Sequence, residues 1–342
     1  MNNQNENENN QENEFRQTEI KEYLRRLKFD EISGDPITSC IIRNIRVVGD
    51  YLYLKIFLGS DQIQIKEKIE EELKNFSWAK KIYLDLKFIK GVRRTIAIGS
   101  GKGGVGKSSI TVGVAQNLKK RGYKVGILDA DVYGPNIPVI TGLNNQDVST
   151  KDEDGVTKFI AIDHDGIKIM SVAMLAKREQ SLAWRGPILT RLLNQFLYQV
   201  DWGDLDFLIV DLPPGTGDTQ ITLLQDSPII GVILVTLPGL SSYSDLIRTT
   251  TMYENFGMPI YGLVENMSFY KCPCCSHVEK LFLDEFPVKN INSKNYNLLT
   301  SLPFFNSKLV AEGINLFLKE EISSYFDNVC SLIEEKANFK NY

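Results

Sequence analysis

From Thr95 onward, apolar segments of strand length alternate with stretches in which apolar residues recur every three or four positions, as on one face of a helix. The apolar segments are nearly continuous runs of Val, Ile and Leu, which is typical of strands buried on both faces. Strands that alternate with helices indicate βαβ crossovers. The pattern predicts an α/β fold with a mainly parallel sheet flanked by helices, its strands at Thr95–Ile98, Val125–Leu128, Ile167–Val172, Phe207–Val210, Gly231–Val235 and Ile260–Val264.

Residues 16–90 have the pattern of a smaller, separate module. Two β-rich runs are separated by Gly49-Asp50, a hairpin-turn dipeptide in reversed order. Helical spacing of apolar residues comes before and after this hairpin, and a third strand follows. We therefore predict a small α/β module with a helix at Ile20–Leu27, strands at Cys40–Val48 and Tyr51–Leu58, a helix at Ile65–Phe76 and a strand at Lys81–Leu86.

Three further segments stand outside these patterns. Residues 1–15 are almost entirely Asn, Gln and Glu, which cannot bury enough surface to offset their ordering entropy, so we predict a disordered tail. Asn144–Asp165 is expected to be a surface excursion, and Glu320–Lys336 an amphipathic helix. The expected domains are the tail, the module over 16–90 and a larger α/β domain over 91–342.

The composition is that of a soluble globular protein, because 43% of the 342 residues are hydrophobic and 24% are charged. A net charge of −4 disfavours nucleic acid as the main partner. We find neither an apolar run of membrane-spanning length nor an apolar signal core, so we expect no membrane association. Three of the five cysteines fall within Cys272–Cys275, which indicates reduced metal-binding thiols and a cytoplasmic protein.

A glycine-rich segment, Gly101–Ser108, joins the first strand of the larger domain to its first helix. This is the context that phosphate binding requires, because glycines let successive N–H groups converge on phosphate oxygens. Lys107 is expected along the β- and γ-phosphates, and the Ser108 hydroxyl on Mg²⁺. Lys102, so early in the loop, is typical of deviant P-loop ATPases, in which it reaches the partner's nucleotide across a dimer. The alternative is a plain glycine-rich turn.

Acidic residues close two of the buried strands. Asp211 ends Leu208–Val210 in the Walker B form and is expected to hold Mg²⁺ through water, while Asp129 and Asp131 follow Leu128. Carboxyl ends of parallel strands face the crevice where ligands bind, so their convergence favours function over capping or turn roles. The segment after Asp211 combines prolines with glycines, as expected of a loop that senses the γ-phosphate, although a rigid loop is the alternative.

The cysteine cluster reads Cys-Pro-Cys-Cys-Ser-His over 272–277. Cys272 and Cys275 have the CxxC spacing with which two thiolates grip one metal. Structural zinc and four-cysteine clusters need four ligands, and the sequence contains no second CxxC, so a second copy of the chain could complete the site. A redox dithiol, an intrachain zinc site with Cys274 and His277, and a cysteine-rich turn without function remain as alternatives.

Together these residues resemble the Mrp/ApbC-type iron–sulfur cluster carrier ATPases, in the MinD-like branch of deviant P-loop proteins. The similarity spans about Gly91 to Gly313 and implies a P-loop NTPase fold. It rests on Gly101–Ser108, Leu128–Asn136, Trp184–Pro187, Trp202–Asp206, the DLPPGTGD sequence of Asp211–Asp218, and Val264–Ser268 followed by Cys272–Cys275. The module is similar to the SufT/PaaD-like domain; Asp35-Pro36 fits that domain, but Gly59-Ser60 stands where a cysteine is usual.

The resemblance implies a homodimer that binds ATP and bridges a [4Fe–4S] cluster through Cys272 and Cys275 of each chain. Asp131 matches the switch I acid that positions the hydrolytic water, Asn266 the residue that recognises adenine, and Pro303 lies in the loop that follows. The implied catalytic residues are Lys102, Asp131 and Asp218, and the metal contacts are Cys272, Cys275 and Ser108. The implied nucleotide-binding set is Gly101, Lys102, Gly103, Gly104, Val105, Gly106, Lys107, Ser108, Ser109, Asp129, Asp211, Asn266 and Pro303.

We therefore interpret the chain as an ATP-hydrolysing carrier that receives clusters from the iron–sulfur assembly machinery and transfers them to apoproteins. The rival interpretation is a MinD/ParA-like positioning switch, which would be favoured by a basic amphipathic anchor at the carboxyl end. Glu320–Lys336 offers no basic face, and a CPxC element has no role in a positioning switch.

Overall fold

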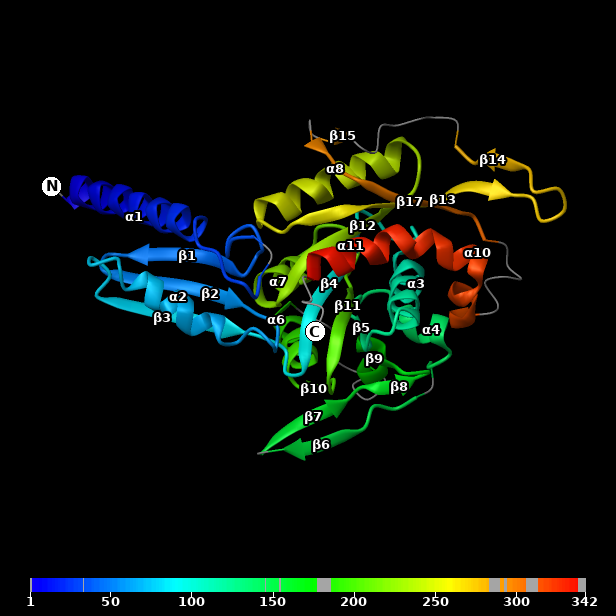
Figure 1. Cartoon of the computed structure of the whole chain (residues 1–342), viewed down its shortest axis with the longest axis horizontal. Coiled ribbons are helices and arrows are strands. Elements are labelled where there is room, and N and C mark those ends of the chain that lie inside the picture. Colours follow the sequence, from blue (N-terminus) through cyan, green and yellow to red (C-terminus); the bar gives the residue numbers. More distant parts are fainter. Residues whose placement is uncertain are drawn as a thin grey trace.

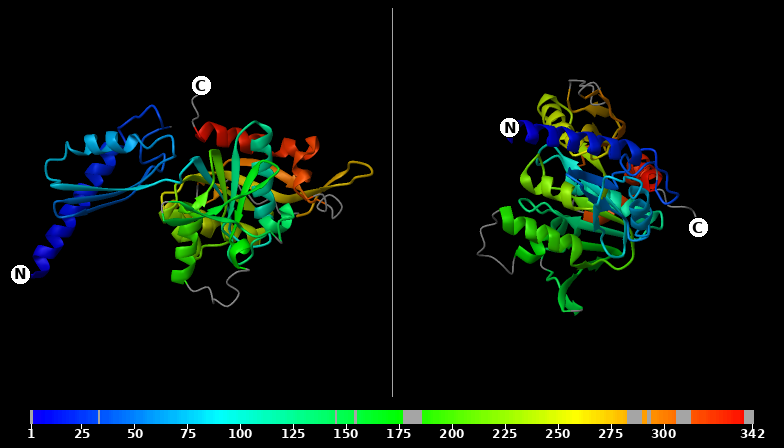
Figure 2. Two further views of the ribbon diagram at one scale, coloured as in Figure 1. Left: turned by 90° about the horizontal axis from the view of Figure 1, so that it is seen from below. Right: turned by 90° about the vertical axis from the view of Figure 1, so that its left-hand side faces the viewer.

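The computed structural model describes residues 2–32, 34–144, 146–153, 155–176, 186–282, 290–291, 294–305 and 313–337. The small module lies at one end of the long axis and the larger α/β domain fills the rest (Figures 1 and 2). The predicted architecture, a mainly parallel sheet flanked by helices and preceded by a small α/β unit, is confirmed. Trp184 and Arg185 of the motif at 184–187 lie outside the described residues.

The module is a three-stranded sheet in the order β1–β2–β3. The predicted hairpin joins β1 (Ile42–Val48) to the antiparallel β2 (Tyr51–Phe57), and β3 (Lys81–Lys87) runs parallel to β2. Helix α2 (Ile65–Leu73) buries its three apolar positions against the sheet, and α1 (Asn2–Leu24) adds Ile20 and Leu24 to the same core.

Helix α1 is longer than the sequence predicts, because it begins at Asn2 where we expected a disordered tail to residue 15. Its carboxyl-terminal half is docked through fully buried Ile20 and Leu24. The preceding turns gain polar support, since Arg16 pairs with Glu12 at 2.6 Å and the Asn13 side chain accepts a hydrogen bond from the N–H of Gly49. These contacts extend the docked helix toward the amino terminus without any apolar surface of its own.

The sheet of the larger domain has the order β14–β13–β12–β4–β11–β5–β9–β8, with β17 also paired to β13. All pairings are parallel except β8 with β9 and β14 with β13. Each predicted strand is present. The bounds are β4 (Val92–Ser100), β5 (Val125–Asp129), β8 (Ile162–His164), β9 (Ile167–Ser171), β11 (Leu205–Asp211), β12 (Ile229–Thr236), β13 (Ile260–Lys271), β14 (Val278–Lys280) and β17 (Leu298–Pro303).

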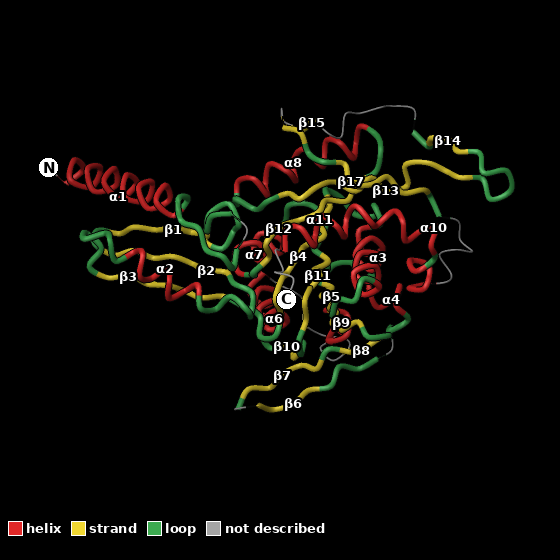
Figure 3. The backbone as a smooth tube through the Cα atoms, in the orientation of Figure 1, coloured by secondary structure: helices red, strands yellow, loops and turns green. Residues whose placement is uncertain are grey.

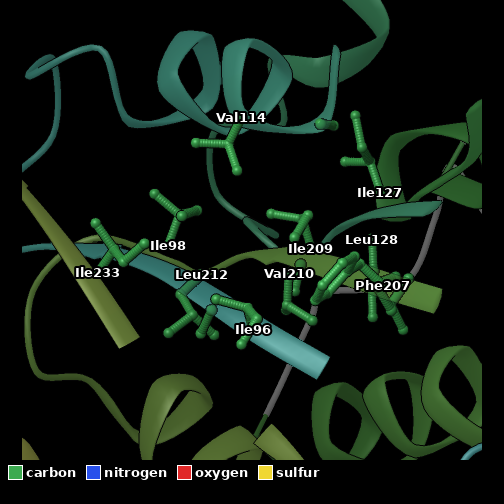
Figure 4. Packing of buried hydrophobic residues seen from close by; sticks show 14 of the residues in the cluster. Ile96, Ile98, Val114, Ile127, Leu128, Phe207, Ile209, Val210, Leu212 and Ile233 are labelled. Atoms are coloured by element: carbon green, nitrogen blue, oxygen red, sulfur yellow. The ribbon is translucent and has the colours of Figure 1, made fainter. Parts of the chain in front are cut away.

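Helices cover both faces of this sheet (Figure 3). Figure 4 shows α3 on one side of the buried strand residues and other helices on the opposite side, with Ile98, Ile209 and Val114 between them. The central strands are therefore apolar on both faces, as the continuous Val/Ile/Leu runs predict. The helices are α3 (Lys107–Lys120), α4 (Ile137–Thr141), α5 (Val172–Ala176), α6 (Gly186–Tyr198), α7 (Asp218–Asp226) and α8 (Leu240–Asn255).

Two segments differ from the sequence-based expectation. The surface excursion at 144–165 forms strands, with β6 (Thr150–Glu153) and β7 (Val156–Ile160) paired as a hairpin beside β10 (Val200–Asp201). The carboxyl-terminal helix is broken into α10 (Glu320–Ser323), a 3₁₀ turn at Ser324–Phe326 and α11 (Asp327–Ala337), after a 3₁₀ segment at Gly313–Leu318. The short strands β15 (Asn290–Ile291) and β16 (Lys294–Asn295) pair with each other.

The break in the carboxyl-terminal helix lies where this segment packs against α3. Phe326 is fully buried against α3, where a Cβ on Gly113 would lie 2.3 Å from its ring. The Ser323 hydroxyl also donates to the Asn117 side chain of α3 at 2.5 Å. Both contacts hold the segment around this turn against α3.

The module is joined to the larger domain at the carboxyl-terminal end of α7. Arg43 of β1 donates hydrogen bonds to the carbonyl oxygens of Leu224 (2.8 Å) and Ser227 (3.1 Å). Lys55 of β2 forms an ion pair with Asp226 at 2.8 Å. A guanidinium and an ammonium at the negative end of a helix are favourable to its dipole, so the junction is electrostatically matched.

Candidate functional site

The glycine loop runs from the end of β4 to the first turn of α3, as the sequence predicts. Gly104 (φ 78°) and Gly106 (φ 85°) have left-handed backbone conformations that disfavour any residue with a Cβ. A Cβ on Gly103 or Gly104 would meet nothing within 4 Å, so this side of the loop is open, whereas a Cβ on Gly106 would lie 2.2 Å from the Asn266 amide. The loop is thus an open cradle on one side and closely packed on the other.

Lys107, Ser108 and Asp211 meet at the floor of this cradle. Lys107 Nζ lies 2.8 Å from Asp211 Oδ2, and Ser108 Oγ donates to the same oxygen at 2.6 Å. The three side chains are buried. Despite the short distance, Lys107 Nζ has no hydrogen-bond acceptor in the required direction among the described residues. A buried ammonium with no directed acceptor, beside a glycine loop that is open at Gly103 and Gly104, is suited to phosphate. The Ser108 and Asp211 oxygens are suited to Mg²⁺.

Asp131 is brought to the same place by the loop after β5. Its Oδ2 lies 3.6 Å from Lys107 Nζ, and its Oδ1 accepts a hydrogen bond from the N–H of Gly134. The side chain is only 6% exposed. The sequence-predicted convergence of Asp131 and Asp211 on the loop is therefore present.

Asp129 has different surroundings from its neighbours. Its carboxylate accepts hydrogen bonds from the Ser171 hydroxyl (2.9 Å) and from the N–H groups of Asp131 and Ile137. Burial, and then the charge of nearby Asp211, raise its pKa to about 8. These contacts hold the loop that carries Asp131. Nucleotide binding by Asp129, which the resemblance implies, stays a prediction.

Lys102 and Asp218 do not join the buried cluster. Lys102 is half-buried, and its carbonyl accepts a hydrogen bond from the Ser100 hydroxyl, but its ammonium has no ion pair with a described residue. Asp218 is exposed in the first turn of α7. The loop before it is bound to the end of β4 by a hydrogen bond from Gly215 N–H to the Ser100 carbonyl. Their catalytic roles stay predictions.

Asn266 and Pro303 lie on neighbouring strands. The Asn266 amide donates to the carbonyl of Val105 at 2.9 Å, which ties β13 to the glycine loop. Pro303 is the last residue of β17 and is paired in register with Phe269, so the expectation that it lies in a loop is wrong. The pairing of β17 with β13 continues the sheet up to that residue. Adenine recognition by Asn266 stays a prediction.

The sequence reasoning missed Thr111 and Ser171. Thr111 Oγ1 lies 2.7 Å from Asp211 Oδ1, and Ser171 holds Asp129. Thr111 follows Lys107 by four residues and so shares its face of the helix, a signal that could have identified it. Ser171 ends β9 in register with Asp129, a pairing that only the strand order reveals.

The cysteines form the tip of a second structure, the β13–β14 hairpin, which extends at the opposite end of the molecule from the module (Figure 1). Cys272 is half-buried, and Cys274 and Cys275 are exposed. The turn is closed by hydrogen bonds from Cys272 N–H to His277 O and from Ser276 N–H to Cys272 O. Backbone hydrogen bonds from Cys275 and then Cys274 hold the pKa of the Cys272 thiol below its ordinary value.

The tip lacks the geometry of a complete metal site in one chain. Across the described residues, no group of three or more His, Cys, Asp or Glu side chains is arranged to hold a metal ion. Among all the residues that the structure describes, none of the helices has both the length and the hydrophobicity needed to cross a membrane.

Comparison with known proteins gives consistent matches. Residues 91–335 match the family model ParA, described as NUBPL iron-transfer P-loop NTPase. An iron–sulfur cluster carrier protein of Aquifex aeolicus is 32% identical over 321 residues, covering 83% of this chain and 87% of the relative. One from Haemophilus influenzae is 33% identical over 304 residues, covering 84% and 81%. A nucleotide-binding protein of Archaeoglobus fulgidus, solved in complex with ADP, superposes with a TM-score of 0.59 at 33% identity, covering 69% of this chain and 92% of that protein.

Proposed function

The chain belongs to the NUBPL family of iron-transfer P-loop NTPases, as an iron–sulfur cluster carrier protein, and on this premise we propose that it binds and hydrolyses ATP and transfers a [4Fe–4S] cluster held between two copies of itself. The observation that carries this proposal is the contrast between a buried Lys107–Ser108–Asp211 cluster under an open glycine loop and an accessible Cys272–Cys275 pair, which supplies two of the four ligands that a cluster needs. The family assignment decides against the positioning-switch alternative.

The residues of the cradle have separate tasks in this proposal. The loop N–H groups and Lys107 bind the phosphates, and Ser108 and Asp211 hold Mg²⁺, which would neutralise phosphate charge when bound. Asp131 orients the attacking water, and Lys102 of each chain reaches the nucleotide of the other. The 3.6 Å approach of Asp131 to Lys107 and the half-buried position of Lys102, which has no ion pair with a described residue, support these assignments.

The cluster is the cargo of the protein. Cys272 and Cys275 of two chains supply four thiolates, and the lowered pKa of Cys272 favours its ligand form. The hairpin presents the thiols beyond the body of the domain, where a second copy, the assembly machinery that donates the cluster and the recipient apoprotein can reach them. All five cysteines are free thiols, which fits the reducing cytoplasm.

Anaerobic reconstitution of the full chain with iron and sulfide tests the proposal. We expect about four irons and four sulfides per two chains, broad absorption near ~400 nm, and Mg²⁺-dependent ATP hydrolysis by the same preparation. Stoichiometric zinc without iron uptake would contradict the cluster assignment. Absence of ATP hydrolysis from the cluster-loaded dimer would contradict the ATPase assignment independently.

A further inference from the structure

Thr111 occupies an unusual position for a threonine. It lies in the second turn of α3, is fully buried, and has no place in the loop motif itself. A β-branched residue is a poorer helix former than alanine, and a buried hydroxyl costs free energy unless it is hydrogen-bonded. The hydroxyl must therefore find a partner that justifies its burial.

That partner is the carboxylate of Asp211. Thr111 Oγ1 lies 2.7 Å from Asp211 Oδ1, closer than the 3.1 Å to the carbonyl of Lys107 one turn earlier in the helix. A hydroxyl has one proton, and a hydrogen bond to an ionised acceptor is shorter and stronger than one to a neutral carbonyl. The geometry thus favours donation to Asp211.

The two oxygens of Asp211 have different kinds of partner. Oδ2 faces Ser108 and Lys107, both of which are needed by Mg²⁺ and phosphate in the proposed function. Oδ1 faces Thr111, which has no other predicted role at the site. When Ser108 and Lys107 turn to the nucleotide, Thr111 remains as the described side-chain partner that keeps the carboxylate oriented.

We infer that Thr111 is a positioning residue that orients Asp211 for Mg²⁺ and so sets the metal dependence of nucleotide binding. The inference rests on the proposed function, because it assumes that Asp211 and Ser108 hold Mg²⁺. Outer hydrogen bonds to metal ligands are worth about 10–100-fold in metal affinity in other proteins. Thr111 acts through Asp211 and does not touch the reacting atoms.

The test uses the full-length protein and a fluorescent ADP analogue, titrated with and without MgCl₂. Thr111→Val keeps the shape but removes the hydroxyl, so we expect the Mg²⁺ concentration for half-maximal tightening to rise ~10–100-fold. Affinity measured in EDTA should change less than about twofold, and Thr111→Ser should restore the Mg²⁺ response. If Thr111→Val does not fold, Thr111→Ala removes the same hydroxyl without a branched carbon.

Thr249 provides the matched control. It is a buried helical threonine whose hydroxyl donates to the Asp245 carbonyl four residues earlier at 2.8 Å, with no carboxylate partner described. Thr249→Val should leave the Mg²⁺ titration unchanged. A normal Mg²⁺ response of Thr111→Val, or an equal loss of affinity in EDTA, would overturn the inference. Failure of the unaltered protein to show any Mg²⁺ effect would instead overturn the proposed nucleotide site.

Discussion

The glycine-loop cradle and the cysteine hairpin differ in how far their functional side chains are buried. At the cradle, Lys107 and Asp211 are buried and already in contact, and the floor is assembled within one chain. At the hairpin tip, Cys274 and Cys275 are exposed on a turn closed by two backbone hydrogen bonds. A site that must bind charge needs a prearranged, water-excluding frame, whereas a site that must pass on its cargo needs access.

The comparison also separates what one chain and two chains can do. The cradle has its phosphate and metal groups in a single copy, apart from the cross-dimer lysine that we propose. In our proposal the hairpin supplies two of the four ligands of a cluster, and a second copy of the chain supplies the other two. The predictions below break or sharpen this contrast, beginning with the largest expected effect.

Removing either outer thiol should abolish cluster binding and leave the cradle untouched. In Cys272→Ser or Cys275→Ser we expect complete loss of iron and sulfide, because two of four ligands disappear from the dimer. Cys274→Ser, on the same exposed turn, is the matched control and should retain the cluster. Iron and sulfide analysis and ATP binding by the same samples check this. Loss of ATP binding, or equal dependence on all three thiols, would break the separation between the two sites.

Substitution of the two lysines of the loop should affect different steps, ATP binding for Lys107 and turnover for Lys102. Lys107→Ala should abolish ATP binding, because it removes the buried cation that faces the phosphates. Lys102→Ala should preserve binding but lower turnover, and loss of a comparable group supplied across an interface costs about 10³–10⁵ in rate elsewhere. Equilibrium binding and steady-state hydrolysis separate the two outcomes. Equal and small effects of both substitutions would argue that Lys102 does not reach the other chain's nucleotide.

The two acids of the cradle should separate by assay. Asp131→Asn should leave ATP bound and reduce hydrolysis by ~10²–10⁴-fold, the range for losing a positioned proton-transfer group. Asp211→Asn should in addition weaken the Mg²⁺ dependence of nucleotide binding, because it removes the negative charge of the carboxylate that holds Mg²⁺ in our proposal. Normal hydrolysis by Asp131→Asn would contradict its assignment to water positioning.

The smallest effect concerns thiol reactivity at the hairpin. A lowered pKa gives Cys272 a larger thiolate fraction at pH 7, so iodoacetamide should modify it faster than Cys274, by less than ~10-fold. With rising pH, the Cys272 rate should level off earlier than the rate of a free cysteine peptide, whose thiol pKa is about 8.5. Peptide mass spectrometry over time measures both rates. Faster modification of Cys274 at pH 7 would indicate that exposure outweighs ionisation.

Much of the cradle could be predicted from sequence, because its residues either follow one another in the glycine loop or stand at the carboxyl ends of parallel strands. Glycine spacing, buried strand runs and terminal acids are local patterns, and parallel pairing brings Asp129 and Asp211 side by side. What the pattern could not supply is orientation. Asp129 lies beside Asp211, but its carboxylate accepts hydrogen bonds from the Ser171 hydroxyl and from the N–H of Ile137 in the segment after β5. These bonds fix the backbone that follows the strand.

Other features depended on contacts between distant segments. The start of α1 at Asn2, the break at Phe326 and the placement of Pro303 at a strand end arise from docking, helix packing and sheet pairing. Arg43 meets the carbonyl of Leu224 across 181 positions of sequence, and no local pattern announces that contact. Local propensity yields to tertiary packing at such places.

Helix α7 has contacts with a different part of the molecule at each of its two ends. Its first residue follows the loop that is hydrogen-bonded to the end of β4 through Gly215. Near its other end, the carbonyl of Leu224 accepts a hydrogen bond from Arg43 of the module. Its nine residues span about 14 Å between these two contacts. Helix α7 therefore connects the module, blue in Figure 1, to the loop that follows the end of β11.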